Sequence, residues 1–147
     1  TRQVNKVVAL EEQSDMVDRA QRSVALNGLQ DQIKIIQADV RTLPETLAPE
    51  TFDVVLSNPP YRPAGAGRVA PNDERARARH ELAGDYVDFV RSAAFLLKNN
   101  GRFCLIFLAE RLAELMSEMR TFRLEPKRKI MNLTYYVFES VLLPMNE

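Results

Sequence analysis

The chain has 147 residues, of which 46% are hydrophobic and 27% charged, and this composition excludes a largely disordered chain or a fibrous repeat. Twenty Lys and Arg residues balance twenty Asp and Glu residues, so the net charge indicates neither a membrane nor a nucleic-acid partner, and any such partner must bind a local patch. The single cysteine, Cys104, excludes an internal disulfide and a cysteine zinc site and favours a cytoplasmic location, and no apolar stretch approaches the roughly 18 residues of a membrane span.

The first part of the chain predicts a strand, a helix and a second strand. Val7–Leu10 is a continuous apolar run followed by two glutamates, as expected of a strand buried on both faces. Ser14 is a suitable N-cap for the helix, and Asn27-Gly28 is a suitable C-terminal stop. Ile33–Gln37 predicts the second strand, with Asp39 just past its end.

The middle of the chain predicts a loop, a third strand and two helices. Residues 43–51 contain two prolines and little periodicity, which predicts mostly loop. Phe52–Leu56 predicts a strand that must end at Asn58-Pro59-Pro60, because consecutive prolines cannot donate ladder hydrogen bonds. After a loop from 62 to 73, helices are expected over 74–80 and 85–98.

The last part predicts a strand over 102–108, with Cys104 buried in it, and a helix over 111–119. Two further strands, 129–133 and 137–143, are close enough in sequence to form an antiparallel hairpin. Strands that alternate with helices predict an α/β fold whose largely parallel sheet is covered on both faces. Ligands of such folds bind outside the carboxyl ends of the strands, so the residues just after each strand are the candidate functional residues.

The sequence Asn-Pro-Pro-Tyr, residues 58–61, is the strongest indication of chemistry. Pro59 disfavours the α region at Asn58, and Pro59 and Pro60 stiffen the turn. A planar amine could donate its two N–H bonds to the side-chain oxygen of Asn58 and the carbonyl of Pro59. Tyr61 could then stack on the substrate ring, as aromatic side chains do on unpaired bases. A strand terminator beside a core tyrosine is the structural alternative.

Four segments in this order resemble the S-adenosylmethionine-dependent amino-methyltransferases, which act on the exocyclic amine of adenine or the amide of glutamine. They are Val7-Val-Ala-Leu-Glu11, Ala25-Leu-Asn-Gly-Leu29, Ala38-Asp-Val40 and Phe52-Asp-Val-Val-Leu-Ser-Asn-Pro-Pro-Tyr61. With Ala78-Arg-His-Glu81 after a glycine-containing loop, the chain is most similar to the bacterial tRNA (valine) adenine-N6 methyltransferases.

This resemblance implies one methyltransferase domain over residues 1–147, with a Rossmann-like, mostly parallel sheet and an antiparallel C-terminal hairpin. It also implies S-adenosylmethionine as cofactor and methyl transfer to the N6 amine of adenine in RNA, with tRNA as the expected substrate. Two alternatives stay open. One is N5-methylation of a protein glutamine, and the other is a catalytically silent remnant of the fold that acts as a binding module.

The resemblance assigns roles by position. Glu11 would hold the ribose hydroxyls of the cofactor, with Glu12 as the adjacent alternative. Asp39 would accept the adenine amine of the cofactor, and Val40 would supply a backbone N–H to its ring. The catalytic residues would be Asn58, which would also contact the cofactor, and the Pro59, Pro60 and Tyr61 that follow it.

The basic residues after the motif are candidates for contacts with RNA phosphates. They are Arg62, Arg68, Arg79 and His80, with Lys127 as a second contact. A solvated basic surface is the alternative. His80 is the only histidine and has no nearby cysteine, so we expect no metal site.

The sequence departs from the family at one place. These enzymes begin their core with a strand and a glycine-rich loop that approaches the methionine part of the cofactor. The five glycines of this chain lie at 28, 65, 67, 84 and 101, and none precedes the first expected strand. We therefore expect the first, central strand of the sheet to be missing here and the natural protein to extend N-terminally.

Overall fold

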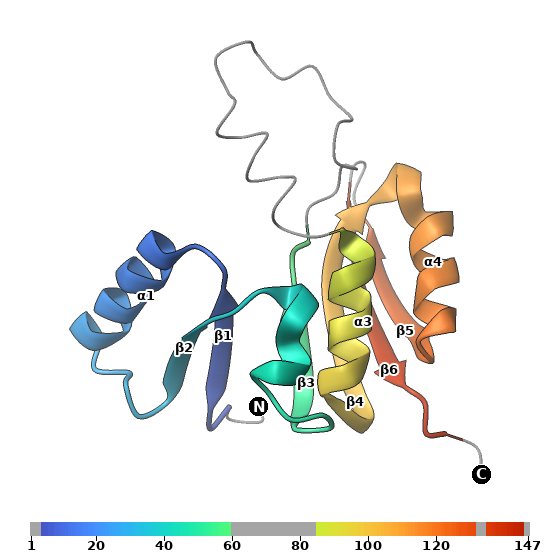
Figure 1. Ribbon diagram of the computed structural model, residues 1–147. Helices are drawn as coiled ribbons and strands as arrows, with labels where there is room; N and C mark the ends of the chain where they lie inside the picture. Colours follow the sequence, from blue (N-terminus) through green and yellow to red (C-terminus); the bar gives the residue numbers. More distant parts are fainter. Residues whose placement is uncertain (1–3, 60–84, 132–134, 146–147) are drawn as a thin grey trace. The chain divides into compact units, whose positions relative to one another are not determined.

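The computed structural model describes residues 4–59, 85–131 and 135–145 (Figure 1). The chain divides into two compact units, Thr1–Thr46, called here the N-terminal unit, and Leu47–Glu147, called the C-terminal unit. A single methyltransferase domain over 1–147 stays a prediction. The helix expected over 74–80 lies outside the described residues. No described helix is long and apolar enough to cross a membrane.

The N-terminal unit is a strand–helix–strand arrangement. Strand β1, Val7–Glu11, pairs in parallel with β2, Ile33–Gln37, in a register that runs from Val7 opposite Ile33 to Glu11 opposite Gln37. Helix α1, Ser14–Leu26, connects them and lies along the two-stranded sheet (Figure 1). The three elements predicted for this part of the chain are therefore confirmed. Val17 on α1 is buried, whereas the strand residues are mostly half-buried.

The two ends of α1 are formed differently from each other. Gln13, not Ser14, is the N-cap residue, and no side chain caps the helix, so the predicted N-cap is wrong. The carboxylate of Glu11 instead accepts the backbone N–H of Gln13 at 2.9 Å, in the turn between β1 and α1. The C-terminus follows the prediction. Gly28 has a φ of +65°, and its N–H and that of Leu29 donate to helix carbonyls at 3.1 Å, as in a Schellman motif.

The loop expected over 43–51 begins with helical residues, which corrects the prediction. A 3-10 helix, η1, spans Val40–Glu45, and Asp39 is its N-cap. The side chain of Asp39 accepts the backbone N–H of Arg41 at 2.8 Å. This local bond holds a short helix that hydrophobic periodicity does not reveal.

The C-terminal unit is a mixed sheet with helices on one face (Figure 1). In it, β3 and β4 are parallel, whereas β6 is antiparallel to both β4 and β5, and the sheet order is β3-β4-β6-β5. The expected C-terminal hairpin is thus confirmed. The elements in chain order are β3 Phe52–Ser57, α3 Tyr86–Leu96, β4 Leu97–Leu108, η2 Ala109–Arg111, α4 Leu112–Thr121, β5 Leu124–Met131 and β6 Tyr135–Leu142.

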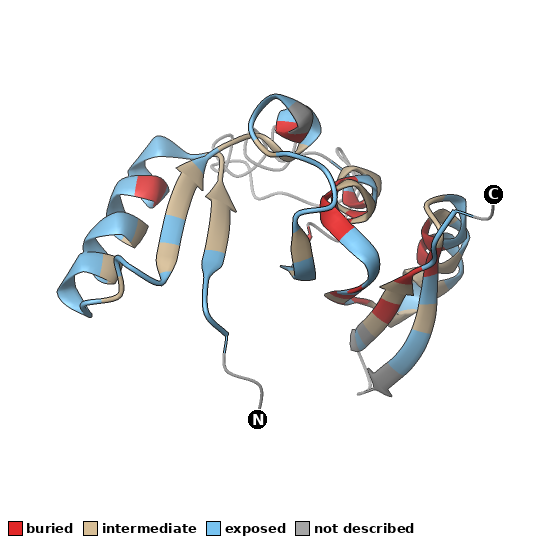
Figure 2. Ribbon diagram, turned by 90° about the horizontal axis from the view of Figure 1, so that it is seen from below, coloured by how far each residue is buried: buried red, intermediate tan, exposed pale blue. Residues whose placement is uncertain are grey.

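Helices α3 and α4 cover one face of this sheet and bury the core, as the burial colours of Figure 2 show. Phe103, Leu105 and Phe107 alternate along β4 and are fully buried in that core. The residues between them point to the other face, where Ile106 is 38% exposed. Cys104 lies on this second face and is half-buried, so the prediction of a buried thiol is wrong.

The junction of α3 and β4 contains an irregularity. The helix ends at Leu96, two residues earlier than expected, and Leu97 already has extended backbone angles. Phe52 pairs with Leu97, yet Val54 pairs with Arg102, so residues 98–101 bulge out of the ladder. A Cβ on Gly101 would lie 2.8 Å from the carbonyl oxygen of Lys98, which is closer than atoms can pack. The bulge therefore requires glycine at this position.

We expect Gly101→Ala to lower the free energy of unfolding by about 1–3 kcal/mol, because the added methyl group must displace backbone. Urea unfolding followed by circular dichroism measures this. Gly28→Asn is the matched control. A side chain at position 28 meets nothing within 4 Å, and asparagine tolerates positive φ. An equal or smaller loss for Gly101→Ala than for Gly28→Asn would contradict the steric explanation.

Candidate functional site

The carboxyl ends of β1 and β2 bring the expected cofactor-binding residues of the N-terminal unit together. Glu11 is the last residue of β1 and lies opposite Gln37, the last residue of β2. Glu12 directly follows β1, Asp39 lies two residues after the end of β2, and Val40 begins η1. Glu11, Glu12 and Asp39 are half-buried. We call Glu11, Glu12, Asp39 and Arg41 the carboxylate cluster.

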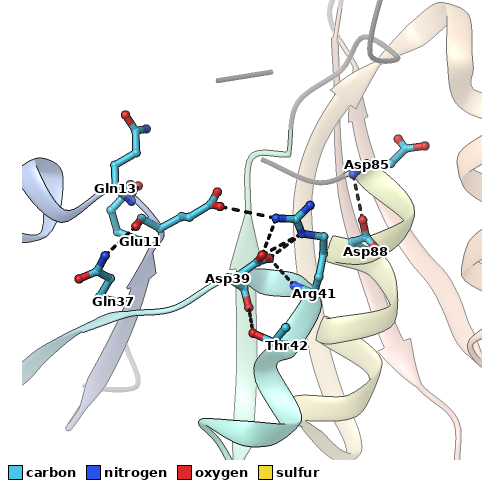
Figure 3. A network of polar contacts seen from close by, with 9 residues as sticks. Glu11, Gln13, Gln37, Asp39, Arg41, Thr42, Asp85 and Asp88 are labelled. Carbon is cyan, nitrogen blue, oxygen red and sulfur yellow. Dashed lines mark hydrogen bonds and ion pairs between the residues drawn. The ribbon is translucent and has the colours of Figure 1, made fainter. Parts of the chain in front are cut away.

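Hydrogen bonds hold the strand ends of this cluster in place (Figure 3). The carboxylate of Glu11 accepts the N–H of Gln13 at 2.9 Å. The side-chain amide of Gln37 donates to the backbone carbonyl of Glu12 at 3.1 Å and so links the end of β2 to the residue after β1. The two strand ends are therefore connected by side chains as well as by the parallel ladder.

Arg41 is the residue of the cluster that the sequence analysis missed. Its backbone N–H donates to Oδ1 of Asp39 at 2.8 Å, and its Nε lies 2.9 Å from both carboxylate oxygens. One terminal guanidinium nitrogen lies 2.5 Å from Oδ2 of Asp39 and 3.6 Å from Oε1 of Glu12 (Figure 3). An arginine two residues after an aspartate that caps a helix is the sequence signal that could have indicated this pairing.

The hydrogen bonds from the Arg41 side chain lower the pKa of Asp39 below its ordinary value of 3.8, against the opposing effect of burial. The Arg41 backbone N–H and the positive charge act in the same direction. Asp39 is therefore an ionised group that only accepts hydrogen bonds at neutral pH. This chemistry fits the donors of an adenosine, namely the amine of the base and the hydroxyls of the ribose.

The predicted catalytic turn begins at the carboxyl end of β3. The strand ends at Ser57, which pairs with Leu105 of β4. Asn58 follows and is exposed, whereas Pro59 is fully buried. A buried proline directly after an exposed asparagine anchors the backbone while the amide side chain remains accessible. Pro60 and Tyr61 lie outside the described residues.

Ser57 adds an unusual feature next to this turn. Its hydroxyl oxygen is buried and has no hydrogen-bond partner within the described part of the chain. Buried hydroxyls are normally paired, and an unpaired one requires an explanation such as a catalytic role or a bound water. The serine directly before Asn58 was not singled out from the sequence, because nothing in its local pattern indicates a lack of partners.

Of the candidate RNA contacts, Lys127 is the one that lies among the described residues. Arg62, Arg68, Arg79 and His80 lie outside the described residues. Lys127 is exposed on β5, which forms the edge of the sheet opposite to β3. The structure therefore does not bring Lys127 and Asn58 together. Among the described residues, no group of three or more His, Cys, Asp or Glu side chains could hold a metal ion.

A second arginine also went unrecognised in the sequence. Arg111 is the last residue of η2, the short helix after β4, and its guanidinium carbon lies 4.8 Å from the ring centroid of Tyr86 and 5.7 Å from that of Phe107. The two rings are 5.1 Å apart. Arg111 also pairs with Glu114 at 2.7 Å. Burial raises the pKa of Tyr86 above its ordinary value of 10.0.

Aspartates hold the start of α3, the helix that carries this tyrosine. The side chain of Asp85 accepts the backbone N–H groups of Tyr86 and Asp88. The side chain of Asp88 accepts the N–H of Asp85 at 3.0 Å in return, which makes a capping box (Figure 3). A cationic, aromatic cluster is thus fixed at the carboxyl end of β4.

Comparisons with known proteins agree on a methyltransferase family for this chain. The family model of UPF0020, described as RMKL-like, methyltransferase domain, matches residues 1–136. A tRNA1(Val) (adenine(37)-N6)-methyltransferase of Bacteroides thetaiotaomicron is 27% identical over 143 residues, which cover 88% of this chain and 58% of that protein. The protein of the same name from Tolumonas auensis is 31% identical over 117 residues, covering 80% of this chain and 47% of the relative. The chain therefore spans about half the length of the curated relatives it matches.

Solved structures show the same fold. A predicted O-methyltransferase from Agrobacterium tumefaciens matches with a TM-score of 0.68 at 19% identity, over 92% of this chain and 62% of that one. TrmN from Thermus thermophilus matches with a TM-score of 0.62 at 22% identity, over 94% of this chain and 36% of that one. The expected Rossmann-like methyltransferase fold is thus confirmed, with strand pairs of mixed orientation.

We expect Arg41→Ala to raise the pKa of Asp39 toward its ordinary value, because the side-chain hydrogen bonds that lower it are lost. A group whose pKa is depressed in the folded state adds stability above its unfolded pKa, and that stability disappears as the pH falls through the folded pKa. The variant should therefore be less stable than the wild type above pH 3.8, and the difference should vanish on further acidification.

Carboxyl carbon NMR measures the pKa of Asp39, and urea unfolding at several pH values measures the stability difference. Arg22→Ala is the matched control, since it removes an exposed arginine of the same unit that pairs with Asp18 at 2.9 Å. An unchanged Asp39 titration in Arg41→Ala would show that the guanidinium does not control this carboxylate.

Proposed function

The chain belongs to the UPF0020 family of RMKL-like methyltransferase domains, and we propose that it is part of an enzyme that methylates the N6 amine of adenine in tRNA. The proposal rests first on Asn58, an exposed amide on a turn that a buried proline anchors at the carboxyl end of β3. It is supported by the similarity to proteins named tRNA1(Val) (adenine(37)-N6)-methyltransferases. S-adenosylmethionine is the proposed cofactor and, when bound, supplies an electrophilic methyl group.

Asn58 and Pro59 provide the chemistry that an adenine amine requires. The lone pair of this amine is delocalised into the ring, so the nitrogen is a poor nucleophile. When the Asn58 side-chain oxygen and the Pro59 carbonyl accept its two N–H bonds, the nitrogen is drawn toward tetrahedral geometry and its lone pair becomes available. Catalysis then depends on positioning and on oriented dipoles rather than on a titrating base. Tyr61, outside the described residues, is proposed to stack on the base.

The carboxylate cluster is proposed to bind the adenosyl part of the cofactor. Glu11 would accept the ribose hydroxyls, with Glu12 as the alternative, and Asp39 would accept the adenine amine. All three side chains are half-buried acceptors at one end of two parallel strands, the position at which ligands bind in such folds. Val40 would contribute its backbone N–H to the ring.

The proposed RNA surface consists of local basic residues, since the chain as a whole carries no net charge. Arg62 directly follows the proposed catalytic turn in the sequence, and the segment after it contains Arg68, Arg79 and His80. Lys127, exposed on β5, would make a separate contact with the phosphate backbone. Such contacts position the RNA without reading its sequence.

The decisive experiment incubates the full-length protein with labelled S-adenosylmethionine and, separately, with tRNA, ribosomal RNA, DNA and a release factor. We expect label in tRNA at the N6 position of adenine. Label in the protein substrate would favour the glutamine alternative, because an amide nitrogen is also planar and delocalised. Cofactor binding without transfer to any of these substrates would instead favour a binding module.

We expect Asn58→Ala to lower the rate of methyl transfer by about 10²-fold or more, the scale for the loss of one preorganised polar group. Cofactor affinity, measured by calorimetry, should change only a few-fold. Asn99→Ala is the matched control, because Asn99 is also exposed but lies in the bulge of β4 between Leu97 and Arg102. Near-normal turnover of Asn58→Ala would rule out amine methylation by this turn.

We expect Arg79→Ala and Lys127→Ala each to weaken tRNA binding, since each removes one phosphate contact. The slope of the logarithm of the binding constant against the logarithm of salt concentration should become shallower by about one unit for each variant. Filter binding over a series of salt concentrations measures this, with Arg22→Ala as the control for loss of an exposed charge. A slope identical to that of the wild type would show that the substituted residue does not contact RNA and belongs to a solvated surface.

A further inference from the structure

The side chain of Arg41 occupies the acceptor positions of Asp39. Backbone N–H and Nε of Arg41 both donate to Oδ1, and Nε and a terminal guanidinium nitrogen both approach Oδ2. A carboxylate has about four lone-pair positions, and three N–H donors of Arg41 engage both oxygens, the single hydrogen on Nε being shared between them. An adenine amine must therefore compete with the guanidinium for Asp39.

The guanidinium is not needed to orient Asp39. The bond from the Arg41 backbone N–H, at 2.8 Å, already holds the aspartate as the N-cap of η1. The donor of this bond belongs to the main chain, so the bond persists wherever the Arg41 side chain points. The additional contacts of the guanidinium thus neutralise the charge of the carboxylate and cover its oxygens. The role of the Arg41 side chain is therefore not to orient Asp39.

A second acceptor lies next to the same guanidinium. Oε1 of Glu12 is 3.6 Å from the terminal nitrogen that contacts Asp39. The Arg41 side chain is 39% exposed and that of Glu12 38% exposed, so a small side-chain rotation can give up the contact with Asp39 and keep the existing ion pair with Glu12. Exposed ion pairs contribute little to stability, and the exchange is correspondingly inexpensive.

We propose that Arg41 is a displaceable cover of Asp39 that competes with the adenine amine of the cofactor and pairs with Glu12 once displaced. The inference rests on the proposed function, in which Asp39 accepts this amine. Arg41 then sets the affinity for adenine-containing ligands without touching the reacting atoms. Glu12 is the acceptor with which the displaced guanidinium pairs.

The test measures binding to the full-length protein by calorimetry with S-adenosylhomocysteine, whose net charge is zero. A neutral probe excludes a general effect of the removed positive charge. We expect Arg41→Ala to tighten its binding about two- to fivefold, the range that corresponds to one exposed ion pair. Arg41→Lys keeps the positive charge but cannot make the bidentate contact of a guanidinium. Its affinity for S-adenosylhomocysteine should lie between those of Arg41→Ala and the wild type. Arg22→Ala, the matched control, should bind like the wild type.

A second probe isolates the amine. S-inosylhomocysteine carries a carbonyl where adenine has its amine and cannot donate to Asp39 there, so Arg41→Ala should not tighten its binding. Glu12→Gln should weaken binding of S-adenosylhomocysteine when Arg41 is present and have no effect in the Arg41→Ala background. An effect of Glu12→Gln that persists in that background would make Glu12 a ribose ligand and would overturn the exchange.

The outcomes separate this inference from the proposed function. If Asp39→Asn weakens binding of S-adenosylhomocysteine while Arg41→Ala leaves it unchanged or weaker, Arg41 is no competitor and the proposed function still stands. If the wild type does not bind S-adenosylhomocysteine at all, both the proposed cofactor site and the role of Arg41 are wrong.

Discussion

Parallel strands that are hydrogen-bonded in register end at the same edge of a sheet, and both groups of candidate functional residues depend on this constraint. The register of β1 with β2 brings Glu11 opposite Gln37 and leaves Glu12 and Asp39 side by side beyond the ladder. The register of β3 with β4 fixes Ser57 opposite Leu105, so that Asn58 emerges where β3 ends. Each functional side chain is thus held by backbone hydrogen bonds that begin several residues before it.

The two units stabilise their functional residues by different means. In the C-terminal unit, β4 buries Phe103, Leu105 and Phe107 under α3 and α4, and this core supports the strand beside Asn58. A core substitution there would move the end of β3 as well as lower stability, because β3 is paired directly with β4. The turn itself is anchored by the buried Pro59.

In the N-terminal unit, the carboxylate cluster is held mainly by polar contacts. Gln37 donates to the Glu12 carbonyl, Glu11 accepts from Gln13, and Arg41 pairs with Asp39. The Arg41–Asp39 pair is partly exposed, with side-chain exposures of 39% and 26%. Partly exposed pairs rearrange at small cost in free energy, as the proposed exchange of partners at this cluster requires.

The sequence by itself determined the features whose cause is local. Short segments rich in β-branched and other apolar residues predicted β1, β2 and β3, although the expected burial of β1 on both faces is wrong, since its residues are half-buried or exposed. Gly28 ended α1 because the C-terminal turn of the helix requires a positive φ. Asn58 and Pro59 marked the end of β3 because prolines cannot continue the ladder. The candidate residues Glu11, Glu12 and Asp39 followed from their place after these strands.

Only the tertiary structure decided the features that depend on distant partners. The helix α3 ends at Leu96 because Leu97 pairs with Phe52 of another strand, and Cys104 is half-buried because helices cover the opposite face of its sheet. Lys127 lies at the far edge from β3 because β6 is inserted between β4 and β5. Arg41 joins Asp39 to Glu12 because parallel pairing brings the ends of β1 and β2 together. A local pattern does not specify such pairings, since they depend on register and strand order across the whole unit.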